Sequence, residues 1–176
     1  VKVLAGAAVA TIGTVPGLSV SYSRGLLAIA VDPQWPVRPF VYVFHTSASG
    51  GDHRISRYTV SGSLNATSST NLLLGQAYVV LAGIPDAQPV HDGACLRFGT
   101  DGMLYASIGD DFDDCASQDP TRLHGKIVRL DVAALPTTGT GPAPRASLVP
   151  PGNPFAGPGD TAPLVWAIGL RNPFRF

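Results

Sequence analysis

The stretch LRFGTDGMLYASIGD, from Leu96 to Asp110, predicts the local fold of this chain most directly. Two runs of apolar and aromatic residues flank Asp101-Gly102, a dipeptide typical of tight turns between antiparallel strands. Glycine favours such a turn because it adopts a positive φ without steric cost. The stretch therefore predicts a β-hairpin, with strands at Ala94–Gly99 and Met103–Gly109.

The same pattern occurs earlier in the chain. IAVDPQWPVRPFVYVFHTS is followed by RISRYTV, just as the hairpin is followed by GKIVRLD. Each copy contains a strand, a turn with Asp, a strand with a central Tyr, and a further strand with an Arg. A repeat of roughly 65–70 residues with about four strands predicts the blade of a β-propeller. The equivalent residues, which lie 63 to 72 positions apart, are Asp32 and Asp101, Tyr42 and Tyr105, and Arg57 and Arg129.

The length of the chain limits the number of such blades. The chain has 176 residues, which is enough for roughly two to three four-stranded blades, whereas a closed propeller needs about four to eight. We therefore expect residues 1–176 to form part of a single β-propeller domain that is incomplete at both ends. The remaining blades of the propeller would then be a partner of this chain.

Other segments of the sequence complete an all-β prediction. The 20 glycines and 16 prolines disfavour long helices. The Pro/Gly-rich segment from Pro136 to Gly159 is expected to be a long ordered loop, because strand signals resume at Leu164. The segment Leu72–Ile84 has room for one or two strands. The other expected strands are Gly25–Pro33, Phe40–Thr46, Arg54–Val60, Gly125–Asp131 and Pro163–Gly169.

Composition and cysteine content narrow the function class and the compartment. Twelve basic residues balance twelve acidic residues, which argues against a nucleic-acid partner. No segment reaches the roughly 20 unbroken apolar residues of a membrane span. Cys95 and Cys115 are predicted to form a disulfide, which would suit a secreted or periplasmic protein. The alternative is a pair of buried free thiols.

Six segments in a fixed order resemble one known family. They are RGLLAIAVDP, RISRYTV, HDGACLRFGTDGMLYASIGDD, SQDPTRLHGKIVRLD, GNPF and WAIGLRNPFRF. The set resembles the glucose/sorbosone dehydrogenase family, the soluble aldose dehydrogenases that use pyrroloquinoline quinone (PQQ). The resemblance implies a six-bladed β-propeller that oxidises the anomeric hydroxyl of an aldose to a lactone and passes electrons to an external acceptor. It also implies a Ca²⁺ ion beside PQQ, held by residues outside this chain.

The resemblance assigns roles to three residues. It implies that His91 is the general base, a role that suits an imidazole because its pKa lies near neutrality. It implies that Arg171 and Asn172 bind PQQ, and that Arg171 stabilises negative charge on a quinone oxygen during catalysis. The alternatives are a loop histidine bonded to a backbone carbonyl and a turn whose arginine forms a surface ion pair.

One position departs from the family. Members usually carry Glu or Gln just before the GLL segment, where this chain has Ser23, whose side chain is too short to make the same contact.

The remaining candidate residues give weaker signals. The acidic run of Asp110, Asp111, Asp113 and Asp114 could bind Ca²⁺, but it lacks the EF-hand spacing, and a solvated loop is the favoured interpretation. His45, His53 and His124 have no convincing metal-ligand spacing.

Two other functions are compatible with the sequence. A non-catalytic propeller that binds other proteins, similar to the Hedgehog-interacting proteins, is favoured by Ser23 and disfavoured by His91 and the intact Arg171-Asn172 pair. A Ca²⁺-dependent lactonase is disfavoured because the chain contains no Glu, a usual metal ligand in such enzymes. Fold alone does not separate an enzyme from a binding module.

Overall fold

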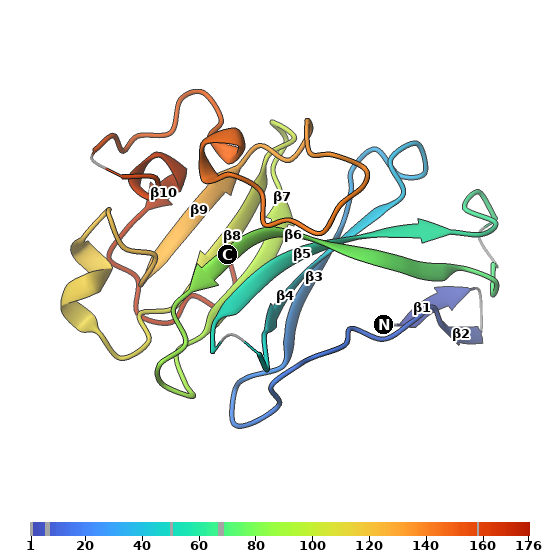
Figure 1. Ribbon diagram of the computed structural model, residues 1–176, viewed down its shortest axis with the longest axis horizontal. Coiled ribbons are helices and arrows are strands. Elements are labelled where there is room, and N and C mark those ends of the chain that lie inside the picture. Colours follow the sequence, from blue (N-terminus) through green and yellow to red (C-terminus); the bar gives the residue numbers. More distant parts are fainter. Residues whose placement is uncertain (1, 6–7, 50, 67–68, 158) are drawn as a thin grey trace.

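Two four-stranded antiparallel sheets contain most of the strands of the chain (Figure 1). The structure is a computed structural model that describes the chain except for residues 1, 6–7, 50, 67–68 and 158. The first sheet has the order β3 (Leu26–Val31), β4 (Phe40–Thr46), β5 (His53–Ser61) and β6 (Leu73–Ile84). The second sheet has the order β10 (Val165–Ala167), β9 (Lys126–Leu130), β8 (Leu104–Ile108) and β7 (Gly93–Phe98).

The remaining elements are short. A hairpin of β1 (Lys2–Ala5) and β2 (Ala8–Thr11), which the sequence did not predict, precedes the sheets. Three 3₁₀ helices follow later: η1 (Asp114–Gln118), η2 (Arg145–Leu148) and η3 (Ala162–Leu164). Within the described residues there is no α-helix, and no helix there is long and apolar enough to cross a membrane.

The predicted strands are confirmed, several of them with shorter ends. Strand β4 has the predicted bounds, and the segment with room for one or two strands contains the single strand β6, Leu73–Ile84. Strand β10 is shorter than predicted because Pro163 lies in η3. Proline has no backbone N–H and fixes φ, so it suits the first turn of a helix better than the interior of a sheet.

The internal repeat appears in the register of the two sheets. Tyr42 lies opposite Arg57 in the first sheet, and Tyr105 lies opposite Arg129 in the second. In both copies the tyrosine hydroxyl donates a hydrogen bond to the turn aspartate, at 3.3 Å in the first copy and 2.9 Å in the second. The two sheets are therefore equivalent units, as the spacing of these residues predicted.

The two copies differ in burial. Tyr42 and Arg57 are buried, whereas Tyr105 is partly exposed. Burial raises the pKa of Tyr42 to about 12. The Arg57 guanidinium lies over the rings of Phe40 and Tyr78, at 4.3 and 5.2 Å from their centroids. The Tyr–Arg pair of the first copy is thus packed in the interior, whereas Tyr105 of the second copy lies nearer the surface.

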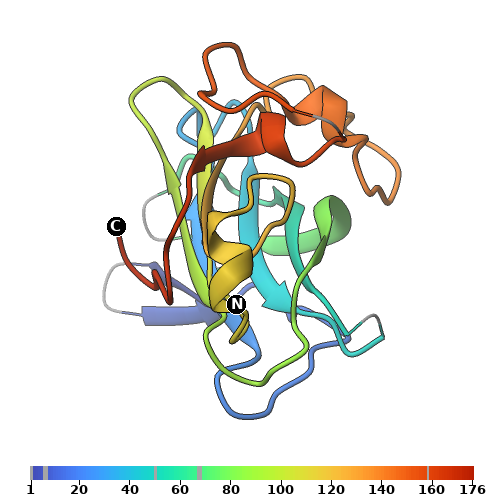
Figure 2. The ribbon, with the colours of Figure 1, turned by 90° about the vertical axis from the view of Figure 1, so that its left-hand side faces the viewer.

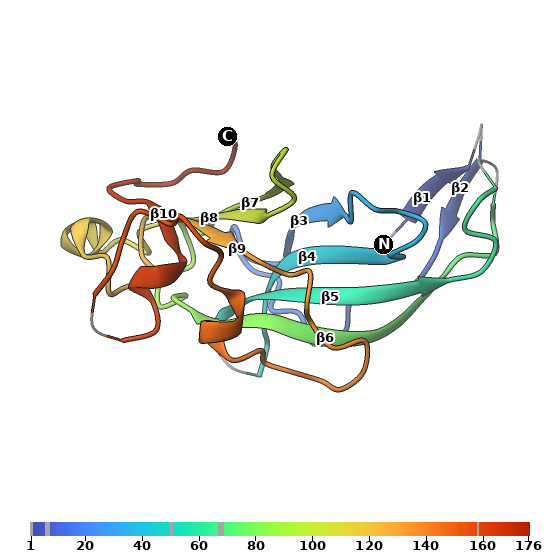
Figure 3. The same cartoon turned by 90° about the horizontal axis from the view of Figure 1, so that it is seen from above.

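A shared hydrophobic core joins the sheets. Strand β7 packs beside β3 and β4, as the view from above shows (Figure 3). The main cluster draws side chains from both sheets, including Phe44, Ile55, Leu104 and Val128. A second cluster covers the other face of the first sheet, where Ile12 and Val15 pack on its strands. Burial on both faces explains why every residue of β4 is buried.

The loop from Pro136 to Gly159 is ordered where it is described, as predicted, and it lies against β6. Val79 donates a backbone hydrogen bond to Thr140, and Ala143 donates one to Val79. The loop therefore covers the outer edge of the first sheet, which would otherwise present unpaired backbone groups.

The predicted disulfide is wrong, because both cysteines are free. Cys95 is buried in β7, where its backbone N–H donates a hydrogen bond to Ser107 Oγ at 2.9 Å. Cys115 is exposed in η1, beyond the end of β8. The two thiols lie in different environments, so neither of the two interpretations of the sequence, a bridge or two buried thiols, describes the pair.

Candidate active site beside the second sheet

His91 and Asp110 form a close pair at one end of the second sheet. His91 lies two residues before β7, and Asp110 lies two residues after β8. The Nδ1 atom of His91 is 2.8 Å from Oδ1 of Asp110. Asp110 is 1 % exposed, so its carboxylate lies inside the protein. The His91 side chain is only partly buried and lies nearer to solvent.

The chemistry of the carboxylate fixes the tautomer of His91. A carboxylate only accepts hydrogen bonds, so Nδ1 carries the proton and donates it to Asp110. The other ring nitrogen, Nε2, then has a free lone pair. A neutral imidazole held in this way can accept a proton from a hydroxyl group at Nε2.

The loop after β8 supports this pair. Asp110 Oδ1 also accepts a hydrogen bond from the backbone N–H of Phe112, at 3.0 Å. The Phe112 ring stacks on the His91 ring, with 4.3 Å between centroids and 13° between planes. Both residues adopt a positive φ, 62° for Phe112 and 64° for His91. Strained backbone at non-glycine residues is often found at functional sites.

Arg171 and Asn172 are docked next to the His91–Asp110 pair. The Asn172 side-chain oxygen accepts a hydrogen bond from the backbone N–H of Gly93 at 2.9 Å, and the Arg171 carbonyl accepts one from Asp110 at 2.8 Å. These bonds dock the C-terminal segment after β10 against the ends of β7 and β8. Figure 2 looks onto the side of the molecule that carries η1 and β10.

The side chains of Arg171 and Asn172 have unused donors. Both residues are exposed. Among the described residues the Arg171 guanidinium has no ion-pair partner, so the predicted alternative of a surface ion pair is not found there. The bond from Gly93 uses the Asn172 oxygen and leaves the amide nitrogen free to donate. The site therefore combines one base with donors for an anionic or carbonyl ligand.

Ser23 lies near this site and holds Asp92. Its hydroxyl oxygen is 2.7 Å from Asp92 Oδ2 and 3.0 Å from the carbonyl oxygen of Pro89. Burial raises the pKa of the Asp92 carboxyl, but the His53 imidazole, the Ser23 hydroxyl and the Arg24 guanidinium together lower it below its usual value. Ser23 therefore stabilises a neighbour of His91.

The acidic run is divided: Asp110 and Asp111 are buried and hold local contacts, whereas Asp114 is exposed, as expected of a solvated loop. Asp110 binds His91, and Asp111 accepts the backbone N–H groups of Ala87 and Gln88 at 2.8 and 2.6 Å. Asp113 caps η1 and pairs with Arg122. Asp110 and Asp111 are buried, so each carboxylate of this pair serves a different local contact. Sequence reasoning missed the link between Asp110 and His91.

A family comparison supports the resemblance. The family model described as glucose/sorbosone dehydrogenase matches residues 1–175. The HIPL2 protein of Arabidopsis thaliana is 36 % identical over 135 residues, which cover 69 % of this chain and 18 % of that protein. The human Hedgehog-interacting protein is 30 % identical over 171 residues, which cover 90 % of this chain and 23 % of that protein.

Solved structures give the same picture of the fold. A Thermus thermophilus protein named as an oxidoreductase (glucose dehydrogenase) has a TM-score of 0.75 at 31 % identity, covering 97 % of this chain and 45 % of that one. The PQQ-bound aldose sugar dehydrogenase of Streptomyces coelicolor has a TM-score of 0.72 at 35 % identity, and the match covers 94 % of this chain and 42 % of that one. The chain thus matches less than half of each relative, as part of a β-propeller dehydrogenase fold, which confirms the predicted class.

Proposed function

Because the chain belongs to the glucose/sorbosone dehydrogenase family, we propose that the complete protein is a PQQ-dependent dehydrogenase that oxidises aldose sugars at the anomeric hydroxyl. The observation that carries this proposal is the His91–Asp110 pair beside Arg171 and Asn172. The solved relative from Streptomyces coelicolor, which contains PQQ, supports the choice of cofactor.

The donor set of the site fits this cofactor. PQQ carries three carboxylates and two quinone oxygens, all of which accept hydrogen bonds. The Arg171 guanidinium is exposed and without an ion-pair partner among the described residues, and it provides a rigid fork of donors. The Asn172 amide nitrogen adds a further donor. Arg171 and Asn172 would therefore hold PQQ, which when bound supplies the acceptor for the hydride of the sugar.

His91 provides the proton acceptor for this oxidation. Loss of a hydride from the anomeric C–H bond leaves the hydroxyl proton to be removed, and Nε2 of His91 is free to take it. Asp110 keeps Nδ1 protonated and stabilises the imidazolium that forms. The products are the lactone and a protonated His91, which returns its proton to solvent.

Several finer features belong to the same proposal. The complete ring would have six blades, of which this chain supplies two to three. A Ca²⁺ ion would be held by residues outside the chain, and an external acceptor would receive the electrons of the oxidation. The protein would work in a secreted or periplasmic location.

A PQQ titration of the complete protein tests the proposal. With Ca²⁺ present, the quinone absorbance should show saturable binding at micromolar PQQ and should bleach when an aldose is added. The variant His91→Ala should bind PQQ without bleaching, whereas His45→Ala, which changes a buried histidine of β4, should bleach normally if folded. Absence of PQQ binding in the folded protein would refute the proposed enzymatic function.

Failure to bind PQQ would favour a second function, that of a non-catalytic propeller that binds another protein. The observation behind it is the 30 % identity to the human Hedgehog-interacting protein over 90 % of this chain. The short Ser23 side chain in place of the family Glu or Gln supports the same alternative.

A further inference from the structure

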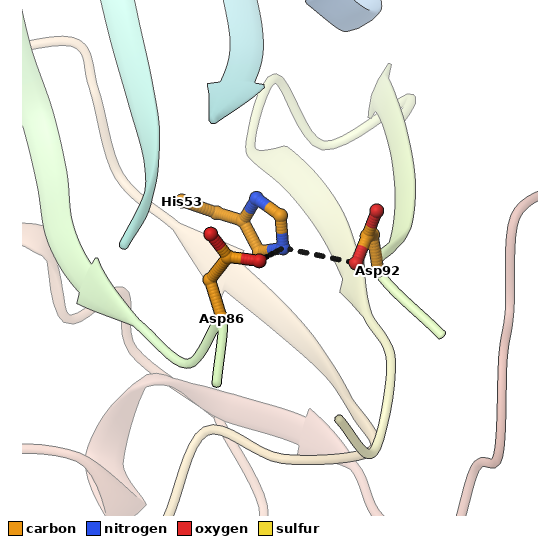
Figure 4. Close-up of side chains that lie close together, drawn as sticks. All are labelled: His53, Asp86 and Asp92. Carbon is orange, nitrogen blue, oxygen red and sulfur yellow. Dashed lines mark ion pairs between the residues drawn. The ribbon is translucent and has the colours of Figure 1, made fainter. Parts of the chain in front are cut away.

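Three ligand-type side chains meet in the interior between the two sheets (Figure 4). His53 is the first residue of β5, Asp86 follows β6 by two residues, and Asp92 immediately precedes β7. One ligand atom from each lies within 4.8 Å of the others, and all three residues are buried. No other group of this kind occurs within the part of the chain that the structure describes.

The His53 ring is aimed at both carboxylates. Its Nε2 atom is 3.3 Å from Asp92 Oδ1 and 3.6 Å from Asp86 Oδ1. His53 is 1 % exposed, yet Nε2 makes no hydrogen bond of acceptable geometry. A buried ring nitrogen that faces two carboxylates without a hydrogen bond to either is costly and rare in folded proteins. The arrangement therefore points to a ligand between the three side chains.

The two distances from the His53 ring nitrogen fit a tetrahedral metal ion. Zn²⁺ binds imidazole nitrogen and carboxylate oxygen at about 2.0–2.2 Å. Two such ligands at a tetrahedral angle lie roughly 3.3 Å apart. The distances from His53 Nε2 to Asp92 and Asp86, 3.3 and 3.6 Å, are close to this value. Both are longer than an ordinary charge-assisted hydrogen bond.

Outer contacts hold two of the ligands in a binding orientation. His53 Nδ1, the ring nitrogen that does not face the carboxylates, forms a hydrogen bond with the Thr46 hydroxyl at 2.9 Å. Ser23 donates to Asp92 Oδ2 at 2.7 Å and leaves Oδ1 facing His53. Metal-binding histidines and carboxylates are usually fixed by hydrogen bonds of this kind to their remaining atoms.

The charge of the cluster also favours a cation. Arg24 Nε donates to Asp86 Oδ1 at 2.7 Å and offsets one carboxylate. Two carboxylates face this space against a single guanidinium, so the excess carboxylate favours a cation between the three side chains. A carboxylate oxygen has two lone pairs, so Asp86 Oδ1 can accept from Arg24 and still face an ion.

We propose that His53, Asp86 and Asp92 bind a divalent cation of the zinc class. The imidazole ligand distinguishes this site from one for Ca²⁺ or Mg²⁺, which prefer oxygen ligands alone. The ion would link the start of β5 with the connection between β6 and β7, and so tie the first sheet to the second. The proposal does not depend on PQQ or on sugar oxidation, because the His91 ring is bonded elsewhere, to Asp110.

Zinc uptake by the complete protein tests this site. Chelator-treated protein in excess Ca²⁺ would be titrated with Zn²⁺ by calorimetry, and one Zn²⁺ per chain should bind. The variant His53→Gln should lose this uptake. The matched variant His45→Gln, which removes a buried imidazole bonded instead to Ser56, should keep it. The variant Ser23→Ala should weaken binding about 10-fold, since it removes only an outer contact.

A spectroscopic readout keeps the test independent of any variant that fails to fold. In a long-range ¹H–¹⁵N spectrum of the wild-type imidazoles, Zn²⁺ should shift Nε2 of His53 and leave His45 unchanged. The proposal is overturned if the His53 resonances do not respond to Zn²⁺, or if His53→Gln takes up zinc as the wild type does. Either result would assign the three side chains a structural role only.

Discussion

His91 Nδ1 and Asp110 Oδ1 lie 2.8 Å apart, because the two residues flank the open end of the β7–β8 hairpin on opposite strands. Gly109 precedes Asp110, and its backbone N–H donates a hydrogen bond to the Asp92 carbonyl at 3.2 Å. The hairpin therefore brings together an imidazole, its carboxylate partner and the backbone that fixes both. The predictions below begin with this relationship.

Replacement of Asp110 by Asn should lower kcat for sugar oxidation by about 10³-fold while PQQ affinity stays close to that of the wild type. The Asn amide can donate to Nδ1 and so favour the tautomer whose Nε2 carries the proton. Steady-state kinetics and a PQQ titration measure the two effects. The control Asp114→Asn changes an exposed carboxylate of the same run and should leave kcat unchanged. Equal kcat values for the two variants would contradict the role of Asp110.

Replacement of Gly109 by Ala should disrupt the site through the backbone. A Cβ atom at Gly109 would lie 1.5 Å from the carbonyl oxygen of His91, so the backbone at His91 has to move. We expect a loss of about 1–3 kcal/mol in the free energy of unfolding, together with loss of turnover. Urea denaturation measures the first effect. In the control Gly157→Ala, the new Cβ meets only Ala162 Cβ at 3.6 Å, so this variant should stay close to wild-type stability. If the two variants are equally stable, the steric argument is wrong.

The Lys126 ammonium should make stability rise with pH above pH 8. Burial lowers the pKa of Lys126 from 10.5 to about 8, so between these values the unfolded chain binds more protons than the folded chain. Stability then increases with pH in that window, by up to about 3 kcal/mol. Urea denaturation at pH 7.5 and 9.5 should show this rise in the wild type.

The variant Lys126→Met isolates this effect. Lys126 Nζ donates to the carbonyls of Ala116 and Ser117 in η1, and to that of His124. The variant should be less stable because these buried carbonyls lose their donor, and its stability should lack the rise between the two pH values. A rise of the same size in wild type and variant would assign the pH dependence to other groups.

The two thiols should differ sharply in reactivity. Cys115 is exposed and Cys95 is buried, so iodoacetamide should alkylate Cys115 in the native protein and Cys95 only in denaturant. Peptide mass spectrometry identifies the labelled residue. The variant Cys115→Ser should show no labelling under native conditions, because its remaining thiol, Cys95, is buried. A linked Cys95–Cys115 peptide in unreduced protein would show that the bridge forms after all.

The strands, turns and repeat were open to prediction because short-range chemistry determines them. The turn at Asp101-Gly102 and the alternating apolar residues around it give the hairpin its register, in which Leu96 lies opposite Ala106. The same chemistry sets the earlier copy, where Tyr42 lies opposite Arg57. Each of these features depends on residues that are close in the sequence.

The partner of His91 required the tertiary structure. Extending the register of Leu96 and Ala106 would place His91 opposite Asp111. A bulge at Ala94, whose φ is 69°, shifts the register by one residue, so that Gly93 lies opposite Ile108 and His91 meets Asp110. The sequence pattern narrows the partner to two neighbouring carboxylates, and the bulge decides between them.

The cluster of His53, Asp86 and Asp92 had no sequence signature at all. Its members are 33 and 6 positions apart and share no helical or strand period. They meet because β7 packs beside the first sheet and brings the connection from β6 to the start of β5. The sequence by itself determined most of the strands, their turns and the family to which the chain belongs. Packing between the sheets decided which charged side chains face one another, because these side chains come from residues that are distant in sequence and meet only in the folded protein.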